Sequence, residues 1–285
     1  MSLAAAPTTA AGGAPWYWAI GGFRRALGLG AFLALAAFIL GPLLTLLVWA
    51  FAGAWLFPNL LPEFSLKWWY YVLGNADVDK AIRMSFLSAP IATLFSAVIC
   101  IPAAYAFARL EFPGRRVLLL SFLCANAFPK IGLYVSIATL FYHLNLMDTF
   151  AGVVLIQVVN TILFMIWIPT GTFRGINRNL EEAARDVGAG PLRTFFQITL
   201  PIAVPGLIVA ALFAFLAAFD EAQGTLIVGT PNHITMPVMM YTLVLSYAQP
   251  VGAVFSVLLS LPSLVFLLLA QRYLRAGYLA AGYSL

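Results

Sequence analysis

Charged side chains are what this sequence has least of. Asp, Glu, Lys and Arg together account for 9% of its 285 residues, whereas 63% of the residues are hydrophobic. In soluble domains, charged residues reach about 25%. A globular core cannot hide this much apolar surface, so the composition excludes an ordinary soluble domain and predicts a protein whose solvent is lipid.

Groups that carry chemistry are also scarce. The two cysteines, Cys100 and Cys124, lie inside apolar segments without metal or redox spacing, and we interpret both as buried small hydrophobes. The sequence has no glycine-rich phosphate loop followed by Lys-Ser or Lys-Thr, so the chain is expected to bind no nucleotide by itself. We therefore predict no catalytic residue, no metal site and no cofactor in this chain.

Long apolar runs are abundant instead, and they are long enough to cross about 30 Å of hydrocarbon. They predict six membrane-spanning helices, at residues 27–56, 84–108, 117–142, 150–173, 202–228 and 251–272. Residues 1–23 begin with small, uncharged residues of low complexity and are expected to form a disordered cytoplasmic tail. Residues 24–285 are expected to form a single transmembrane domain. The predicted fold class is an all-α integral membrane protein.

The basic residues indicate the orientation in the membrane. In a six-span scheme, one side carries arginines at positions 24–25, 109–116, 174–193 and 272–275. The other side carries Lys67, Lys80 and Arg83, which acidic residues nearby offset. Because loops rich in Lys and Arg remain in the cytoplasm, both termini are expected there. This topology accounts for the net charge of +5, which is therefore no argument for a nucleic-acid partner.

Residues 179–197 are a polar island between two apolar runs. Asn179 is placed to cap a short helix whose first turn carries two glutamates, the favoured charge at a positive helix end. Gly188 is expected to end that helix in the left-handed conformation, and Pro191 suits the first turn of a second helix. The pattern predicts a helix–turn–helix on the cytoplasmic side.

Both of these helices are too short to persist alone in water, so both must dock on something. One possibility is that they fold back on the ends of their own bundle. The other is that they bind a soluble partner, which a charged rim, small alanines and two exposed phenylalanines, Phe195 and Phe196, would favour.

The stretch "EAARDVGAGPLRTFFQITLP" resembles the signature of the membrane permeases of bacterial binding-protein-dependent ABC importers. That signature reads Glu-Ala-Ala, three residues, Gly, nine residues, Ile, one residue, Leu-Pro. It falls here on Glu182, Ala183, Ala184, Gly188, Ile198, Leu200 and Pro201. The stretches at 103–116 and near the carboxyl end are similar to the maltose-type carbohydrate permeases. The resemblance covers about residues 65 to 283.

The resemblance implies a type I importer permease fold in the bacterial inner membrane, with six spans and a cytoplasmic coupling helix. It also implies a second permease subunit, two ATPase subunits that bind the ATP, and a periplasmic or lipid-anchored solute-binding protein. In the family, the segment equivalent to 179–197 sits in a cleft of the ATPase. The residues implied at this contact are Glu182, Ala183, Ala184, Gly188, Leu192, Phe195 and Phe196.

Three ionisable residues lie at membrane depth, where a charge is costly and usually faces a partner or a cavity. Lys130 follows a proline in the third apolar run, and Asp220 and Glu221 lie late in the fifth. An ion pair between the lysine and one of the acids is one reading; a solute route that favours anionic or hydroxylated solutes is the other. Other polar candidates for such a route are Asn126, Gln157, Asn160 and Gln223.

The leading hypothesis is a non-catalytic, pore-forming subunit of an ATP-driven importer for a carbohydrate or a carbohydrate derivative. A polyamine-type permease is the alternative within the same class, because the acidic pair would suit cations. An intramembrane enzyme organised around the His-x4-Asp spacing of His143 and Asp148 is a weaker alternative, as is a self-sufficient secondary transporter. His233 is interpreted as a solvated loop residue.

Overall fold

A computed structural model describes residues 17–55 and 59–280 of the chain. Helix α1 spans Tyr17–Ala50, and its part up to Val48 forms one unit; the chain from Trp49 onward forms a second one. Residues 1–16 of the expected disordered tail lie outside the described residues. For residues 17–23 that expectation is wrong, because these residues belong to α1 and no proline separates them from the apolar run that follows.

The second unit is built from helices. In chain order they are α2 (Lys67–Leu73), α3 (Ala76–Arg109), α4 (Arg115–Ala127), α5 (Lys130–His143), α6 (Phe150–Gly175), α7 (Arg178–Asp186), α8 (Pro191–Thr194), the π-helical turn η1 (Phe195–Thr199), α9 (Leu200–Phe219), α10 (Gln223–Gly229), α11 (Met236–Ser246) and α12 (Gln249–Ala280). Within the described residues, five helices are long and apolar enough to span a membrane, and six if the bent pair α4 and α5 is one span.

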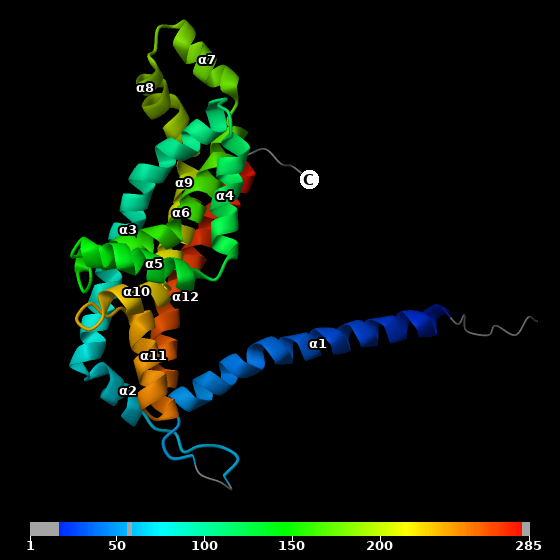
Figure 1. Cartoon of the computed structure of the whole chain (residues 1–285). Helices are drawn as coiled ribbons and strands as arrows, with labels where there is room; N and C mark the ends of the chain where they lie inside the picture. The colour runs from blue at the N-terminus through cyan, green and yellow to red at the C-terminus, as the bar shows by residue number, and fades with distance from the viewer. Residues whose placement is uncertain (1–16, 56–58, 281–285) are drawn as a thin grey trace, which may run out of the picture. The chain divides into compact units, whose positions relative to one another are not determined.

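The core of this unit lies where α6 packs against α3 and α9, and α12 runs along α9 (Figure 1). Small residues occupy the contact, among them Ala104 on α3 and Ala203, Ala210 and Ala214 on α9, all fully buried. Small side chains let helix backbones approach closely, which replaces the hydrophobic drive that is missing between helices in lipid. The spans are therefore joined mainly by close packing.

The span expected at 117–142 is not one continuous helix. It consists of α4 and α5, whose axes are bent by 101° at Phe128 and Pro129. Phe128 is extended, with φ −85° and ψ 154°, as a residue before proline prefers, and Pro129 has no N–H to continue the ladder of α4. The backbone therefore breaks at the proline, and Lys130 is the first residue of α5.

The span expected at 202–228 is displaced toward the amino terminus. Residues Pro191–Phe219 are helical throughout, since α8, η1 and α9 follow one another without a break. The helix ends at Phe219, directly before the acidic pair, and α10, most of which falls within the expected span, follows as a separate helix. The expectation failed because hydropathy does not register the backbone turn at the acidic residues.

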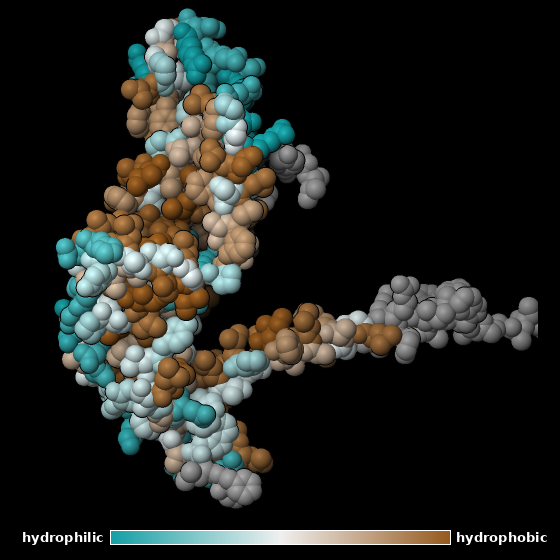
Figure 2. All heavy atoms as spheres, viewed as in Figure 1, coloured by the Kyte–Doolittle hydropathy of each residue, from teal (hydrophilic) through white to brown (hydrophobic). Residues whose placement is uncertain are grey.

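The outer surface of the second unit matches a lipid solvent. Figure 2 shows hydrophobic side chains over the middle of the bundle and hydrophilic side chains at the end formed by α7 and α8. Leu94 and Val98 on α3 and Leu264 on α12 are among the exposed apolar residues. Of the two cysteines, Cys100 is buried as expected, but Cys124 is exposed, because it faces outward on α4.

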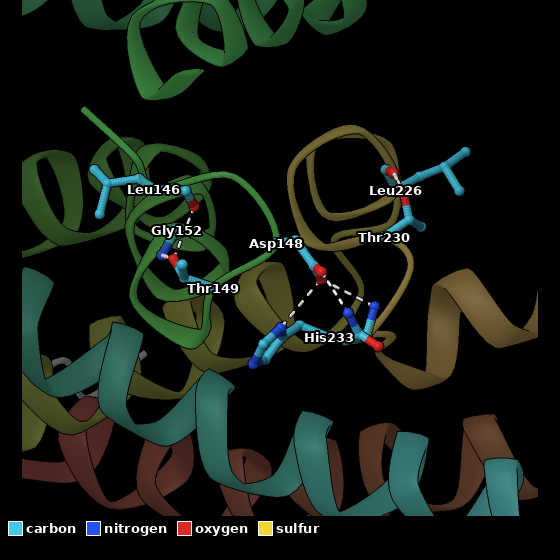
Figure 3. Close-up of polar contacts among 8 residues, drawn as sticks. Leu146, Asp148, Thr149, Gly152, Leu226, Thr230 and His233 are labelled. Carbon is cyan, nitrogen blue, oxygen red and sulfur yellow. Dashed lines mark hydrogen bonds and ion pairs between the residues drawn. The ribbon is translucent and has the colours of Figure 1, made fainter. Parts of the chain in front are cut away.

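The start of α6 depends on a backbone contact that only glycine permits. Thr149 caps α6 by accepting a hydrogen bond from Gly152 N at 3.0 Å (Figure 3). A Cβ added to Gly152 would lie 2.1 Å from the carbonyl oxygen of Leu146, which belongs to the preceding loop. A Cβ added to Gly171 on the same helix would meet no atom within 4 Å.

We predict that Gly152→Ala lowers the free energy of unfolding by roughly 1–3 kcal/mol, the usual cost of overpacking. The backbone oxygen of Leu146 cannot move aside without displacing the loop. Thermal unfolding in detergent measures the effect, and Gly171→Ala is the matched control on α6. Equal melting temperatures for the two variants would contradict the predicted contact.

Candidate functional site

The polar island forms a helical hairpin at one end of the bundle (Figure 1). Helix α7 is capped by Asn177, whose side chain accepts a hydrogen bond from Asn179 N at 3.0 Å. The expected cap at Asn179 is wrong, because the helix begins at Arg178 and Asn179 lies inside its first turn. Gly188 has φ +89°, which confirms the left-handed turn. Pro191 is the first residue of α8, as predicted.

The second arm of the hairpin, helix α8, is continuous with a candidate membrane span. Helix α8 passes through the π-helical turn Phe195–Thr199 into α9, so that residues 191–219 form one rod. A helix transmits displacement along its axis because its backbone hydrogen bonds hold each turn to the next. Any movement imposed on α8 therefore reaches the core of the bundle directly.

One face of the hairpin is exposed, with nothing packed over it among the described residues. Glu182 and Ala183 on α7 are exposed, Leu192 is 75% exposed and Phe196 is 60% exposed. Ala184 is half-buried. Exposed apolar side chains rimmed by charges are typical of a protein–protein contact.

The opposite face docks on the bundle. The ring centroids of Phe195 and Tyr105, which lies on α3, are 4.9 Å apart, and both rings pack near Phe173 of α6. Phe195 is therefore half-buried, and the expectation of two exposed phenylalanines holds only for Phe196. The hairpin uses one face to hold on to its own spans and leaves the other free for a further contact.

A cluster that the sequence analysis did not identify lies beneath α7. Glu181 is 4% exposed, and Arg109 Nε donates to its Oε1 at 3.0 Å. Thr199 Oγ1 donates to the same oxygen at 2.8 Å. These residues are far apart in the sequence, and the pattern indicated only a helix-end charge for Glu181 and a loop charge for Arg109. No signal in one sequence pairs them.

A cavity of about 470 Å³ opens between the hairpin and the end of α3. Tyr105 and Arg109 line it from α3, and Glu182, Leu192 and Phe196 line it from the hairpin. The cavity thus adjoins the uncovered face, and the same side chains border both.

The polar candidates at membrane depth separate into two groups. Lys130 Nζ donates a hydrogen bond to Asn160 Oδ1, and Asn160 Nδ2 donates to the backbone oxygen of Ala217 on α9 at 2.6 Å. Asn126 joins these residues around a small cavity of about 120 Å³. The structure therefore brings Lys130, Asn126 and Asn160 together at the break between α4 and α5.

The acidic residues are used differently. Glu221 is buried and accepts hydrogen bonds from Gly224 N at 2.7 Å, Thr225 N at 2.8 Å and Thr225 Oγ1 at 2.7 Å. In the part of the chain that the structure describes, Lys130 forms no ion pair with Asp220 or Glu221, so that reading is wrong. The carboxylate of Glu221 holds the first turn of α10 instead.

The remaining polar candidates lie apart from the lysine cluster. Asp220, after the end of α9, and Gln223, at the start of α10, are exposed. Gln157 on α6 is fully buried, and neither of its amide atoms has a partner among the described residues. A buried amide without partners is costly, which is typical of a group that meets water or a ligand in another state.

The loop before α6 and the loop after α10 are joined by a carboxylate (Figure 3). Asp148 accepts hydrogen bonds from Asn232 N at 2.9 Å and lies 3.3 Å from His233 Nδ1. The expected dyad of His143 and Asp148 is not formed; the aspartate pairs with His233, which is half-buried and no freely solvated residue. The backbone N–H of Asn232 is the main cause that lowers the pKa of Asp148, and the contacts with the Asn232 amide and His233 add to it.

Comparison with known proteins shows which family the chain matches. Residues 83–279 match the family described as "Binding-protein-dependent transport system inner membrane component". The trehalose transport system permease protein of Mycobacterium tuberculosis is 33% identical over 192 residues, which cover 66% of this chain and 70% of that protein. The maltose/maltodextrin transport system permease protein of Vibrio vulnificus is 30% identical over 279 residues, 90% of this chain and 93% of that one.

Among solved structures, a bacterial ABC transporter involved in the import of the acidic polysaccharide alginate has a similar chain. The TM-score is 0.67 at 20% identity, and the match covers 89% of this chain and 96% of the other. At this identity the likeness shows a shared fold.

We predict that Asp148→Asn lowers the melting temperature in detergent at neutral pH, because an amide accepts the Asn232 and His233 hydrogen bonds less strongly than a carboxylate does. Since the folded pKa is lowered, this contribution is fully present above the unfolded value of 3.8 and is lost as the pH falls through the folded pKa. The difference in melting temperature between the variant and the parent should therefore become smaller at acidic pH. A difference that stays constant down to pH values well below 3.8 would contradict the prediction.

Proposed function

This chain belongs to the binding-protein-dependent transport system inner membrane components, and from that membership we propose that it is the pore-forming permease of an ATP-driven carbohydrate importer. The resemblance to ABC importer permeases and the all-α permease fold expected from the sequence are confirmed by the family match and by the fold shared with the alginate importer. The chain is a multi-pass membrane protein of a transport family.

The proposal that ATP drives this permease is carried by one observation. The hairpin has an uncovered face, and its second arm is continuous with α9. An ATPase subunit that grips Glu182, Ala183 and Phe196 would therefore displace a span whenever it changes shape. A contact that is stronger in one conformation of the bundle biases an inward–outward equilibrium.

The proposed assembly contains this chain, a second permease, two ATPase subunits and an extracytoplasmic solute-binding protein. One solved neighbour is an alginate importer in complex with a periplasmic protein bound to an alginate pentasaccharide, which supports such a partner. We place the chain in the inner membrane with both termini in the cytoplasm, because the six-span scheme puts the arginine-rich segments and the hairpin on one side of the membrane.

Carbohydrate is the proposed solute class. The names of the two relatives refer to trehalose and to maltose and maltodextrin, and the fold neighbour imports an acidic polysaccharide. In this chain the hydrogen-bonding groups around Lys130, Asn126 and Asn160 suit sugar hydroxyls, and the ammonium suits an anionic derivative. A polyamine is less well matched, because the carboxylate of Glu221 is already occupied by three donors.

We predict that Glu182→Lys releases the ATPase subunits from an otherwise inserted permease. Reversing a charge at a protein–protein contact leaves opposed like charges and lowers affinity by at least about tenfold. Co-purification of the ATPase with the tagged permease measures the loss. Glu111→Lys, an equally exposed glutamate before α4, is the control, and full retention of the ATPase by Glu182→Lys would refute the proposed contact.

We predict that Lys130→Ala changes which solutes are carried and leaves the assembly intact. Losing a hydrogen bond from a charged group costs enough to lower uptake of an anionic uronic acid oligosaccharide about tenfold relative to neutral maltose. Uptake is measured in proteoliposomes in the presence of each sugar or of putrescine as a competitor, which gives the solute preference of each variant. Lys67→Ala, on the exposed helix α2, is the control. An unchanged profile would remove the lysine from the solute route.

A further inference from the structure

The ion pair under α7 differs from the other ion pairs of the described residues in its burial. The side chains of Glu181 and Arg109 are 5% and 7% exposed, whereas those of Asp79 and Arg83 on α3 are 54% and 79% exposed. Removing two charges from water is expensive, so such a pair persists only with good geometry and additional hydrogen bonds. Both requirements are met here.

The polar partners of Glu181 come from two separate parts of the bundle, the end of α3 and the start of α9. Arg109 at the end of α3 donates through Nε to Glu181 and through a terminal nitrogen to the backbone oxygen of Ile176 at 3.0 Å, so it grips the chain on both sides of the α7 cap. Thr199, at the junction of η1 and α9, donates to Glu181 from the other direction. Tyr105 OH on α3 lies 3.5 Å from the second carboxylate oxygen.

We propose that Glu181 and Arg109 are positioning residues that lock α7 to α3 and α9, so that the hairpin and two spans move as one body when the ATPase subunits change shape. We call Glu181, Arg109 and Thr199 the carboxylate joint. This inference rests on the proposed function, since it assigns the joint to the transmission between ATPase and spans.

The need for such a joint follows from the geometry of the hairpin. The second arm is continuous with α9, but α7 is only nine residues long and is joined to the spans by loops at both of its ends. A short helix held only by apolar contact can roll on its support when it is pushed. Hydrogen bonds that are directed, charged and shielded from water resist that rolling, because each fixes a direction as well as a distance.

If the ion pair between Glu181 and Arg109 served stability alone, replacing both residues by apolar ones would leave transport unchanged in a protein that still folds. Removing one partner leaves an unpaired buried charge and destabilises the protein, whereas replacing both by apolar residues of similar volume is often neutral for stability. The variant with Arg109→Met and Glu181→Leu therefore separates stability from transmission. Thr199→Val removes only the hydrogen bond between Thr199 and Glu181 and nearly preserves the shape of the side chain.

The experiment uses the complete importer in proteoliposomes, with the solute-binding protein added as purified with its own bound ligand. The first readout is the factor by which this protein stimulates ATP hydrolysis. The second is the distance between spin labels at Asp186→Cys on α7 and Val98→Cys on α3, with and without ATP and vanadate, after Cys100 and Cys124 are replaced by alanine. Glu111→Gln is the matched control, an exposed glutamate on the same side.

We expect the parent and Glu111→Gln to show one narrow label distance that ATP and vanadate leave unchanged. In Thr199→Val and in the double variant, the ATPase should still co-purify, the distance should broaden and shift, and the stimulation should fall about tenfold, as expected for lost hydrogen bonds to a charge. Parent-like distance and stimulation in both variants would overturn the joint while leaving the proposed function intact. A parent that neither retains an ATPase nor responds to the binding protein would overturn the proposed function itself.

Discussion

Most of the buried ionised and amide side chains described above depend on partners within the chain, because neither lipid nor a close-packed helix contact offers any. That constraint explains the placement of the scarce polar residues. Glu221 is surrounded by three donors of α10, Asn160 is held between Lys130 and a backbone oxygen of α9, and Glu181 is held by an arginine and a threonine. Each unpaired group would cost several kcal/mol in hydrocarbon, so each of these clusters also fixes where two or more helices meet.

In the proposed importer, the same constraint would also let the hairpin transmit movement. Its buried face is fastened by the aromatic contact of Phe195 with Tyr105 and by the carboxylate of Glu181, and its other face remains free. An element that is firmly held on one side and uncovered on the other can pass a partner's movement to the spans. A loop without the joint, or a hairpin buried on both faces, could not do this.

The interior of the bundle suggests where a solute would pass. The break between α4 and α5 at Pro129 opens a small polar cavity at membrane depth, as expected where irregular backbone lines a route through protein. Gln157 lies buried in the core of α6 with both amide atoms unpartnered among the described residues, which fits a group that is paired in a different conformation.

The sequence by itself determined what depends on local chemistry: the all-helical membrane class, the left-handed turn at Gly188, the helix start at Pro191 and the family signature. It placed Lys130, Asn126 and Asn160 among the polar candidates, but it could not pair them. Only the tertiary structure decided that Lys130 binds Asn160 and no acidic residue, that Asp148 pairs with His233, and that Glu181 meets Arg109. The reason is physical: periodicity, breakers and caps act over a few residues, whereas a buried charge is satisfied by whichever helix the packing brings to it.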